Sequence, residues 1–140
     1  MKMLIAADGS EYTKRMLAYI AAHDEWLGNR HEYTVIHTVL ALPPRAAAFV
    51  SSEMAARFHD EEVESVFRPI RAFFEMQGIA ATFVRTIGHA GESIANLARE
   101  GRFDLVVMGA RGHGDLVNLI LGSVATRVIA GCAVPVLLVR

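Results

Sequence analysis

The chain has 140 residues, which at roughly 100–200 residues per domain predicts one domain spanning residues 1–140. Hydrophobic residues make up 53% and charged residues 21% of the chain, which is enough apolar material for a packed core and excludes a disordered protein. Lys plus Arg is 14 and Asp plus Glu is 15, so the net charge of -1 argues against non-specific binding of nucleic acid.

Cysteine content and the longest apolar runs indicate the cell compartment. Cys132 is the one cysteine, so no internal disulfide can form and a reducing, cytoplasmic location is expected. The apolar run at residues 3–7 ends at Asp8 and is too short for a signal peptide or a membrane span. We therefore expect neither a membrane nor a nucleic acid as a partner.

The first predicted strand and helix meet at a short polar turn. Residues 3–7 are continuously apolar, which is typical of a strand covered on both faces. The strand ends at Asp8, and Ser10 is expected to cap the helix that follows. Residues 33–40 are rich in β-branched and aromatic side chains and predict the second strand.

A long helix is predicted in the middle of the chain. Pro43-Pro44 predicts a loop, Ser51 is a start signal, and the helical pattern continues to about Gln77. Pro69 is expected to kink or interrupt this helix. Its apolar side, which is expected to join the core, consists of Met54, Phe58, Val63, Val66, Phe67, Ile70, Phe73 and Phe74.

The second half of the sequence predicts three more strands and two helices. The strands are expected at residues 81–87, 105–108 and 134–139, and the helices at residues 92–100 and 123–130. Strands separated by helices pair in parallel through right-handed crossovers. The pattern therefore predicts an α/β protein with a single doubly wound five-stranded parallel sheet and helices on both faces.

Ligands of an open α/β sheet bind beyond the carboxyl ends of its strands. This rule indicates Asp8, the end of the second strand at Thr38 and Val39, and the glycine-rich loop after Met108. The loop contains Gly109, Arg111, Gly112, His113 and Gly114, and a helix opens at Gly122 and Ser123. Glycines bring backbone N–H groups close to an anion, and a helix N-terminus attracts one, so the two elements could hold a polyphosphate.

The glycine spacing fits neither the P-loop nor the dinucleotide fingerprint. The chain has no Gly-Lys-Ser/Thr and no lysine after Lys14. From the spacing alone, a flexible loop followed by an ordinary helix cap is an equal alternative. Asp8 also has two readings, because an aspartate at this position can cap a turn as well as bind a ligand.

Four segments in order resemble the universal stress protein (UspA-like) family, in its ATP-binding branch. They are the opening strand with residues 8–11, the second strand at residues 35–39, residues 104–109 and the ending at residues 134–139. The spacing G-x-x-G, nine residues and G-S at Gly109, Gly112, Gly122 and Ser123 resembles the nucleotide-binding signature of the family. The resemblance covers the whole chain. It implies an adenine nucleotide alpha hydrolase-like fold that binds ATP, or AMP or ADP, with Mg²⁺ as a possible companion.

The resemblance also implies roles for particular residues. Asp8 would lie near the ribose, the phosphates or a Mg²⁺ ion, and Thr38 would contact the adenine through its backbone. The complete set of nucleotide-contacting positions would be Ala6, Ala7, Asp8, Thr38, Val39, Met108, Gly109, Arg111, Gly112, His113, Gly114, Gly122, Ser123, Val124 and Ala125. Ala6, Ala7 and Ala125 stand where some members have polar residues, and losing one hydroxyl contact costs about 1 kcal/mol.

Function is left with three alternatives. The first is a stress-response sensor or binding module for ATP. The second is a slow ATPase or phosphotransferase, which the absence of positioned lysines and of a clear general base disfavours. The third is a dimeric interaction protein that binds no nucleotide.

Several other features carry expectations. His37 is expected to be a satisfied core histidine, and Cys132 a buried, inert thiol. Residues 49–58 could cover a ligand or a partner. The apolar last strand, residues 134–139, is expected at a sheet edge, where it would pair with a second copy to form a homodimer, as the family does.

Overall fold

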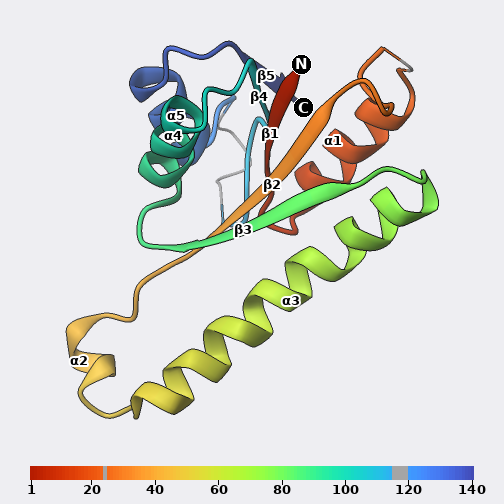
Figure 1. The fold of residues 1–140 in the computed structure, drawn as a ribbon. Helices are drawn as coiled ribbons and strands as arrows, with labels where there is room; N and C mark the ends of the chain where they lie inside the picture. The colour runs from red at the N-terminus through yellow and green to blue at the C-terminus, as the bar shows by residue number, and fades with distance from the viewer. Residues whose placement is uncertain (24, 115–119) are drawn as a thin grey trace.

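A computed structural model describes residues 1–23, 25–114 and 120–140 (Figure 1). Its five strands are all parallel and lie in the order β3-β2-β1-β4-β5. Their bounds are β1 Lys2–Ala6, β2 Glu32–Val39, β3 Ala81–Ile87, β4 Leu105–Gly109 and β5 Val136–Val139. The predicted five-stranded doubly wound sheet is confirmed, and β5 lies at one edge as expected.

Helices cover both faces of the sheet (Figure 1). Helices α1 (Glu11–Ala21) and α3 (Ser52–Met76) pack on one face, and α4 (Ala90–Glu100) and α5 (Ser123–Gly131) pack on the other. A short helix, α2 (Pro44–Ala47), follows β2 where the sequence predicted only a loop. Its first residue is a proline, which suits the start of a helix because no N–H is needed there.

Alternate residues of the central strands form two cores. In β1, Met3 and Ile5 face α1 and α3, whereas Leu4 and Ala6 face α4 and α5. All four side chains are buried, as the unbroken apolar run predicted for a strand with no solvent-facing side.

Pro69 does not interrupt α3, which is continuous from Ser52 to Met76, so the predicted interruption is wrong, whereas the alternative of a kink stays a prediction. A proline inside a helix removes the amide that would bond to the carbonyl four residues earlier, here that of Ser65. Both residues are exposed, so water can reach the carbonyl that lacks a helical donor. The buried residues of α3 on either side, including Phe67 and Ile70, keep the helix against the sheet through this point.

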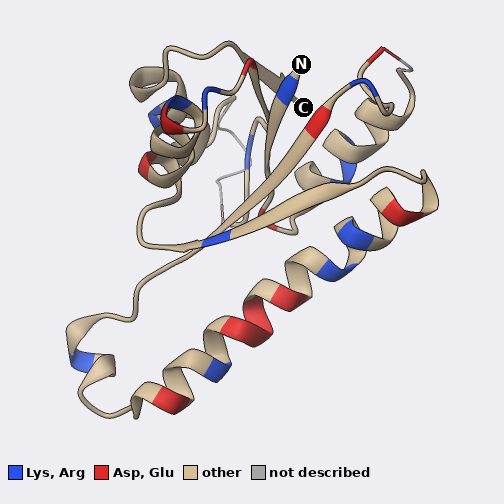
Figure 2. Ribbon diagram, in the orientation of Figure 1, with Lys and Arg blue, Asp and Glu red and all other residues tan. Residues whose placement is uncertain are grey.

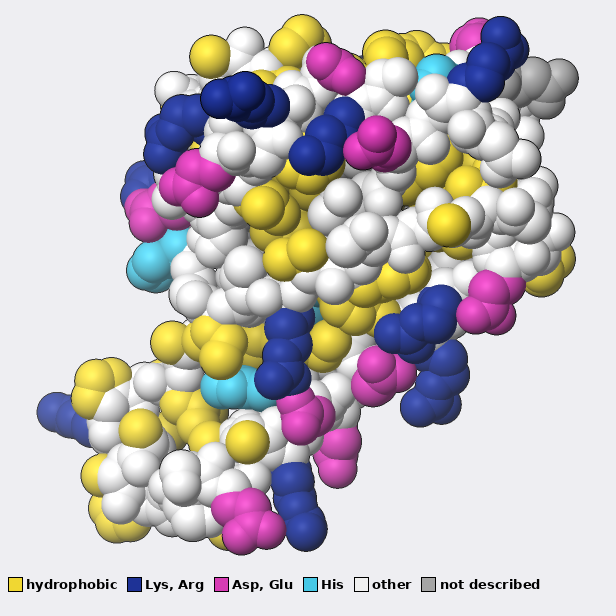
Figure 3. Space-filling view, viewed as in Figure 1, with side chains coloured by type: hydrophobic (Ala, Val, Ile, Leu, Met, Phe, Trp, Pro, Cys, Tyr) yellow, Lys and Arg dark blue, Asp and Glu magenta, His cyan; other side chains and the backbone are white. Residues whose placement is uncertain are grey.

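Helix α2 and the first turns of α3 project beyond the sheet, and we call residues 44–60 the arm (Figure 1). Met54 and Phe58 are 62% and 59% exposed, so their prediction as core residues is wrong, and Phe73 is only partly buried. Phe49 is 92% exposed, and apolar side chains gather on the arm in the space-filling view (Figure 3). Helical spacing places Met54 and Phe58 on the apolar side of α3, but the sheet does not extend far enough to cover these two side chains.

Three smaller expectations need correction. The Ser10 side chain makes no cap hydrogen bond, although Ser10 occupies the N-cap position of α1. Strand β5 begins at Val136 rather than at residue 134, and the Pro135 carbonyl accepts the first ladder bond from the Val106 amide. Cys132 is only partly buried, because it follows the last residue of α5.

Candidate ligand site

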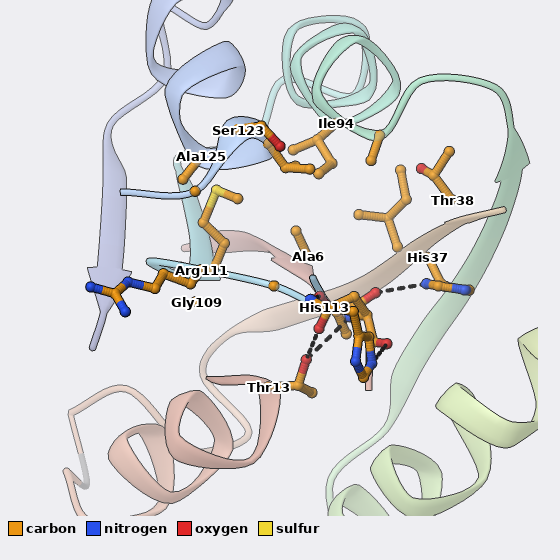
Figure 4. A pocket seen from close by; sticks show the side chains of 18 of the residues that line it. Ala6, Thr13, His37, Thr38, Ile94, Gly109, Arg111, His113, Ser123 and Ala125 are labelled. Carbon is orange, nitrogen blue, oxygen red and sulfur yellow. Dashed lines mark hydrogen bonds between the residues drawn. The ribbon is translucent and has the colours of Figure 1, made fainter. Parts of the chain in front are cut away.

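A cavity of about 250 Å³ opens at the carboxyl ends of the strands (Figure 4). It lies where β1 and β4 run side by side. From β1 the chain passes to β2 and β3 on one side of the sheet, and it returns to the other side of β1 as β4. This is the switch point of an open α/β sheet, at which ligands characteristically bind. The volume is close to the lower end of the roughly 300–1,000 Å³ usual for small-molecule sites.

The cavity brings together thirteen of the fifteen positions implied by the sequence. These are Ala6, Ala7, Asp8, Thr38, Met108, Gly109, Arg111, Gly112, His113, Gly122, Ser123, Val124 and Ala125. Val39 is not among the lining residues, because its side chain belongs to the core under α1 and α3. Gly114 is not among them either and lies next to residues 115–119, which fall outside the described part of the chain.

Sequence reasoning missed seven lining residues, which are Thr13, Ile36, His37, Leu40, Glu62, Ala90 and Ile94. Ile36 could have been inferred, since it precedes Thr38 by two residues and shares its face of β2. Glu62, Ala90 and Ile94 come from helices packed against the sheet. Nothing in their local sequence indicates a site, because only the tertiary arrangement brings them to the strand ends.

Asp8 is the most heavily bonded side chain of the cavity. Its Oδ1 accepts hydrogen bonds from the Ser10 amide and the Thr13 hydroxyl, both at 2.9 Å, and Oδ2 accepts one from the His113 amide at 3.2 Å. Gly9, which lies between Asp8 and Ser10 in the chain, has φ +77°, a conformation that favours glycine. The carboxylate therefore closes the turn after β1 and also lines the cavity, and its role in ligand binding stays a prediction.

These contacts also set the ionisation of Asp8. Burial alone raises the pKa of the carboxyl, but the hydrogen bonds from Ser10 and Thr13 and the nearby charge of His113 outweigh it. The pKa consequently lies below its usual value of 3.8, and the side chain is a carboxylate at neutral pH.

The glycine loop after β4 packs directly onto Asp8. A Cβ atom at Gly112 would lie 2.4 Å from Oδ2 of Asp8, so a side chain there would displace the carboxylate. The ring of His113 donates from Nε2 to the Asp8 carbonyl at 3.0 Å. The labelled side chains of His113 and Thr13 meet around this point in the close-up view (Figure 4).

Several loop amides that were expected to face an anion are bonded within the protein. The His113 amide donates to Asp8, the Ala110 amide to the Val139 carbonyl at 2.7 Å, and the Gly122 amide to the Ala110 carbonyl at 2.8 Å. The N-terminus of α5 has no side-chain cap, and its first residues, Ser123, Val124 and Ala125, line the cavity. The helix end thus supplies a positive electrostatic feature of the site.

The opposite end of the cavity is formed by β2 and α3. His37 is buried, as expected of a core histidine, and its Nδ1 donates to the Ala7 carbonyl at 2.9 Å. Its Nε2 lies 3.4 Å from Oε1 of Glu62. Beside it, the hydroxyls of Thr38 and Thr86 are 2.7 Å apart, which joins β2 to β3 near the cavity.

Within residues 1–23, 25–114 and 120–140, no three His, Cys, Asp or Glu side chains form a group that could hold a metal ion. The same ranges contain no helix that is long and apolar enough to cross a lipid bilayer.

The sheet is an open parallel α/β sheet with a cavity at its switch point, the place where α/β proteins of this class bind ligands. A model described as the universal stress protein family matches residues 1–140. A universal stress protein of Thermus aquaticus, from the 3′ region of a QAH/OAS sulfhydrylase, is 32% identical over 142 residues, covering 99% of this chain and 97% of that protein. The chain belongs to the universal stress protein family.

Solved structures show the same fold. Protein MJ0577 of Methanocaldococcus jannaschii superposes with a TM-score of 0.84 at 24% identity, covering 99% of this chain and 94% of that one. A universal stress protein family protein of Arabidopsis thaliana, solved with AMP bound, has a TM-score of 0.72 at 14% identity, covering 99% and 90% of the two chains.

Proposed function

We propose that this protein binds an adenine nucleotide in the cavity at the switch point and acts as a stress-response sensor or binding module, with ATP as the leading ligand. The observation that carries the proposal is the uncapped N-terminus of α5 facing the same cavity as the Asp8 carboxylate. A helix N-terminus favours phosphate, and a carboxylate suits the hydroxyls of a ribose. The AMP bound to the Arabidopsis relative supports the assignment.

The cavity residues fit Mg²⁺ only in the company of a nucleotide. Mg²⁺ in nucleotide sites is held by one or two carboxylates together with the substrate phosphates. Asp8 could supply one oxygen, since Oδ2 accepts one described hydrogen bond, while phosphates at α5 would supply others. When bound, the ion would neutralise part of the phosphate charge next to Asp8.

Binding is favoured over turnover. Phosphoryl transfer relies on positioned cations and a group that orients the nucleophile. The sequence has no lysine after Lys14, and Nε2 of the His113 ring is already engaged, because it donates to the Asp8 carbonyl. We place this binding function in the cytoplasm, in keeping with the single cysteine of the chain.

Val124→Asp tests the phosphate end of the proposed site. Val124 lies in the first turn of α5 and is 37% exposed, so an aspartate there suits the helix dipole and should leave the fold intact. The new carboxylate would repel a phosphate at the same helix end. With AMP, ADP or ATP at about 100 times Kd, the wild-type unfolding midpoint should rise by roughly 5–10 °C, and V124D should lose most of this rise.

Ile129→Asp is the matched control for this experiment. Ile129 is 47% exposed on the same helix but does not line the cavity, so I129D should keep the nucleotide-dependent rise. If no adenine nucleotide raises the wild-type midpoint, the proposed function is wrong. If V124D responds to nucleotide as the wild type does, the phosphates do not bind at α5.

A further inference from the structure

Glu62 is a second carboxylate in the wall of the cavity, and the proposed phosphate site does not account for it. It comes from α3, which packs on the face of the sheet opposite to α5. Asp8 is the other acidic residue among those that line the cavity. A carboxylate is an unfavourable neighbour for a phosphate, so Glu62 is suited to an uncharged or hydrogen-donating part of a ligand.

The two ends of the cavity differ in charge. At one end, the N-terminus of α5 carries partial positive charge at Ser123. At the other end, Glu62 and Leu40 line the cavity beside the end of β2. Asp8 follows β1, which is the strand between β2 and β4. A nucleotide with its phosphates on α5 and its ribose at Asp8 would therefore direct its base towards Glu62.

The contact with His37 positions the side chain of Glu62. A carbonyl oxygen only accepts hydrogen bonds, so His37 must carry a proton on Nδ1 to bond to Ala7. The other ring nitrogen, Nε2, lies 3.4 Å from Oε1 of Glu62, so this contact holds Oε1 next to the ring. Either of the two atoms can be the donor in this contact. No described hydrogen bond occupies Glu62 Oε2, although the side chain is only 39% exposed. Because Glu62 lines the cavity, its carboxylate belongs to the wall that a hydrogen-bond donor of a ligand would meet.

We propose that Glu62 determines base specificity by accepting a hydrogen bond from the amino group of a 6-aminopurine. The inference rests on the proposed nucleotide site and adds to it the group that distinguishes the base. A 6-oxopurine presents a carbonyl in place of the amino group, and two acceptors facing each other forfeit the bond and repel. The site would therefore select adenine over hypoxanthine.

AMP and IMP are the appropriate probes, because they have the same ribose and phosphate. Their bases differ in the substituent at position 6 and in the N1 proton that accompanies the 6-oxo group. We expect wild-type protein to bind AMP at least about tenfold more tightly than IMP, as a lost bond to a charged group implies. In Glu62→Gln the side-chain amide can both accept and donate, so the ratio of the two Kd values should fall to within about threefold. Isothermal titration calorimetry measures both constants.

Glu61→Gln is the control for charge and helix composition, since Glu61 is exposed on the same turn and does not line the cavity. It should keep the wild-type ratio. Glu62→Ala provides a second test and should weaken AMP binding while leaving IMP binding unchanged or stronger. A thermal unfolding midpoint for each variant establishes that it is folded.

The outcomes separate the two proposals. If the wild type binds neither nucleotide, the proposed function fails and the specificity role fails with it. If the wild type binds AMP but does not prefer it to IMP, or if E62Q and E62A keep the full preference, the site is a nucleotide site and the role assigned to Glu62 is wrong.

Discussion

Asp8 joins the two loops that form the floor of the cavity. It accepts from Ser10 and Thr13 on its own side and from His113 on the other, so one carboxylate orders both the turn after β1 and the glycine loop after β4. Gly112 is needed for the same reason, because any Cβ there would collide with Oδ2. The ionised form of Asp8 is thus part of the folded structure as well as of the proposed ligand site.

This ionisation makes a prediction about stability and pH. The folded-state pKa of Asp8 lies below the usual value of 3.8, so the stabilisation it provides is complete above that value and is lost as the pH falls through the folded-state pKa. Asp8→Asn should therefore lower the free energy of unfolding at about pH 7, and the deficit should shrink towards about pH 3. Urea titrations at both pH values measure it, and a deficit independent of pH would contradict the assignment.

At the scale of elements, α3 consists of two halves in different surroundings. Its second half packs Phe67, Ile70 and Phe74 under the sheet, whereas its first turns belong to the arm. Acidic residues gather at positions 60–64 of the helix, and basic residues lie on either side of them (Figure 2). The Arg85–Asp60 ion pair and the His37–Glu62 contact tie α3 to the sheet where the arm begins. The Arg85–Asp60 pair is exposed and stabilises little, so packing holds the second half in place.

Two phenylalanines on this helix test the difference. Phe74 is 1% exposed and Phe58 is 59% exposed. Phe74→Ala should lower the free energy of unfolding by about 3–5 kcal/mol, because it removes buried apolar surface and leaves a cavity. Phe58→Ala should change it by about 0.5 kcal/mol or less. Chemical denaturation of both variants compares them directly, and equal losses would mean that the arm packs against protein in solution.

At the scale of the whole molecule, the free edge of β5 is the feature that predicts assembly. The Val106 amide donates to the Pro135 carbonyl, so in a parallel ladder the amides of Val136 and Leu138 face away from β4. An edge with outward amides and apolar side chains invites pairing with another strand. We propose that two copies pair along β5 about a two-fold axis.

Light scattering tests this pairing. The expected mass is twice the 15.3 kDa of the chain. Val136→Pro removes one outward amide while keeping the intramolecular ladder and a side chain of similar size, so it should shift the protein towards monomer without unfolding it. A wild-type monomer at micromolar concentration would rule out the dimer, and a V136P dimer would move the interface away from β5.

The sequence by itself determined the class of fold and the chain positions around which the cavity forms. Continuous apolar runs fix strands covered on both faces, and the residues after β1 and β4 must then meet at one edge of the sheet, so Asp8 and Gly112 could be named in advance. These inferences succeed because they depend on periodicity and chain direction, which are local properties.

Only the tertiary structure decided what stands opposite those residues and which apolar side chains find cover. Glu62 enters the cavity because α3 crosses the end of β2, and Phe58 remains exposed because the sheet ends before the arm does. The same helical spacing that buries Phe74 places Phe58 in solvent. Spacing gives the direction in which a side chain points, whereas burial depends on whether another element lies there, and that is a property of the assembled fold.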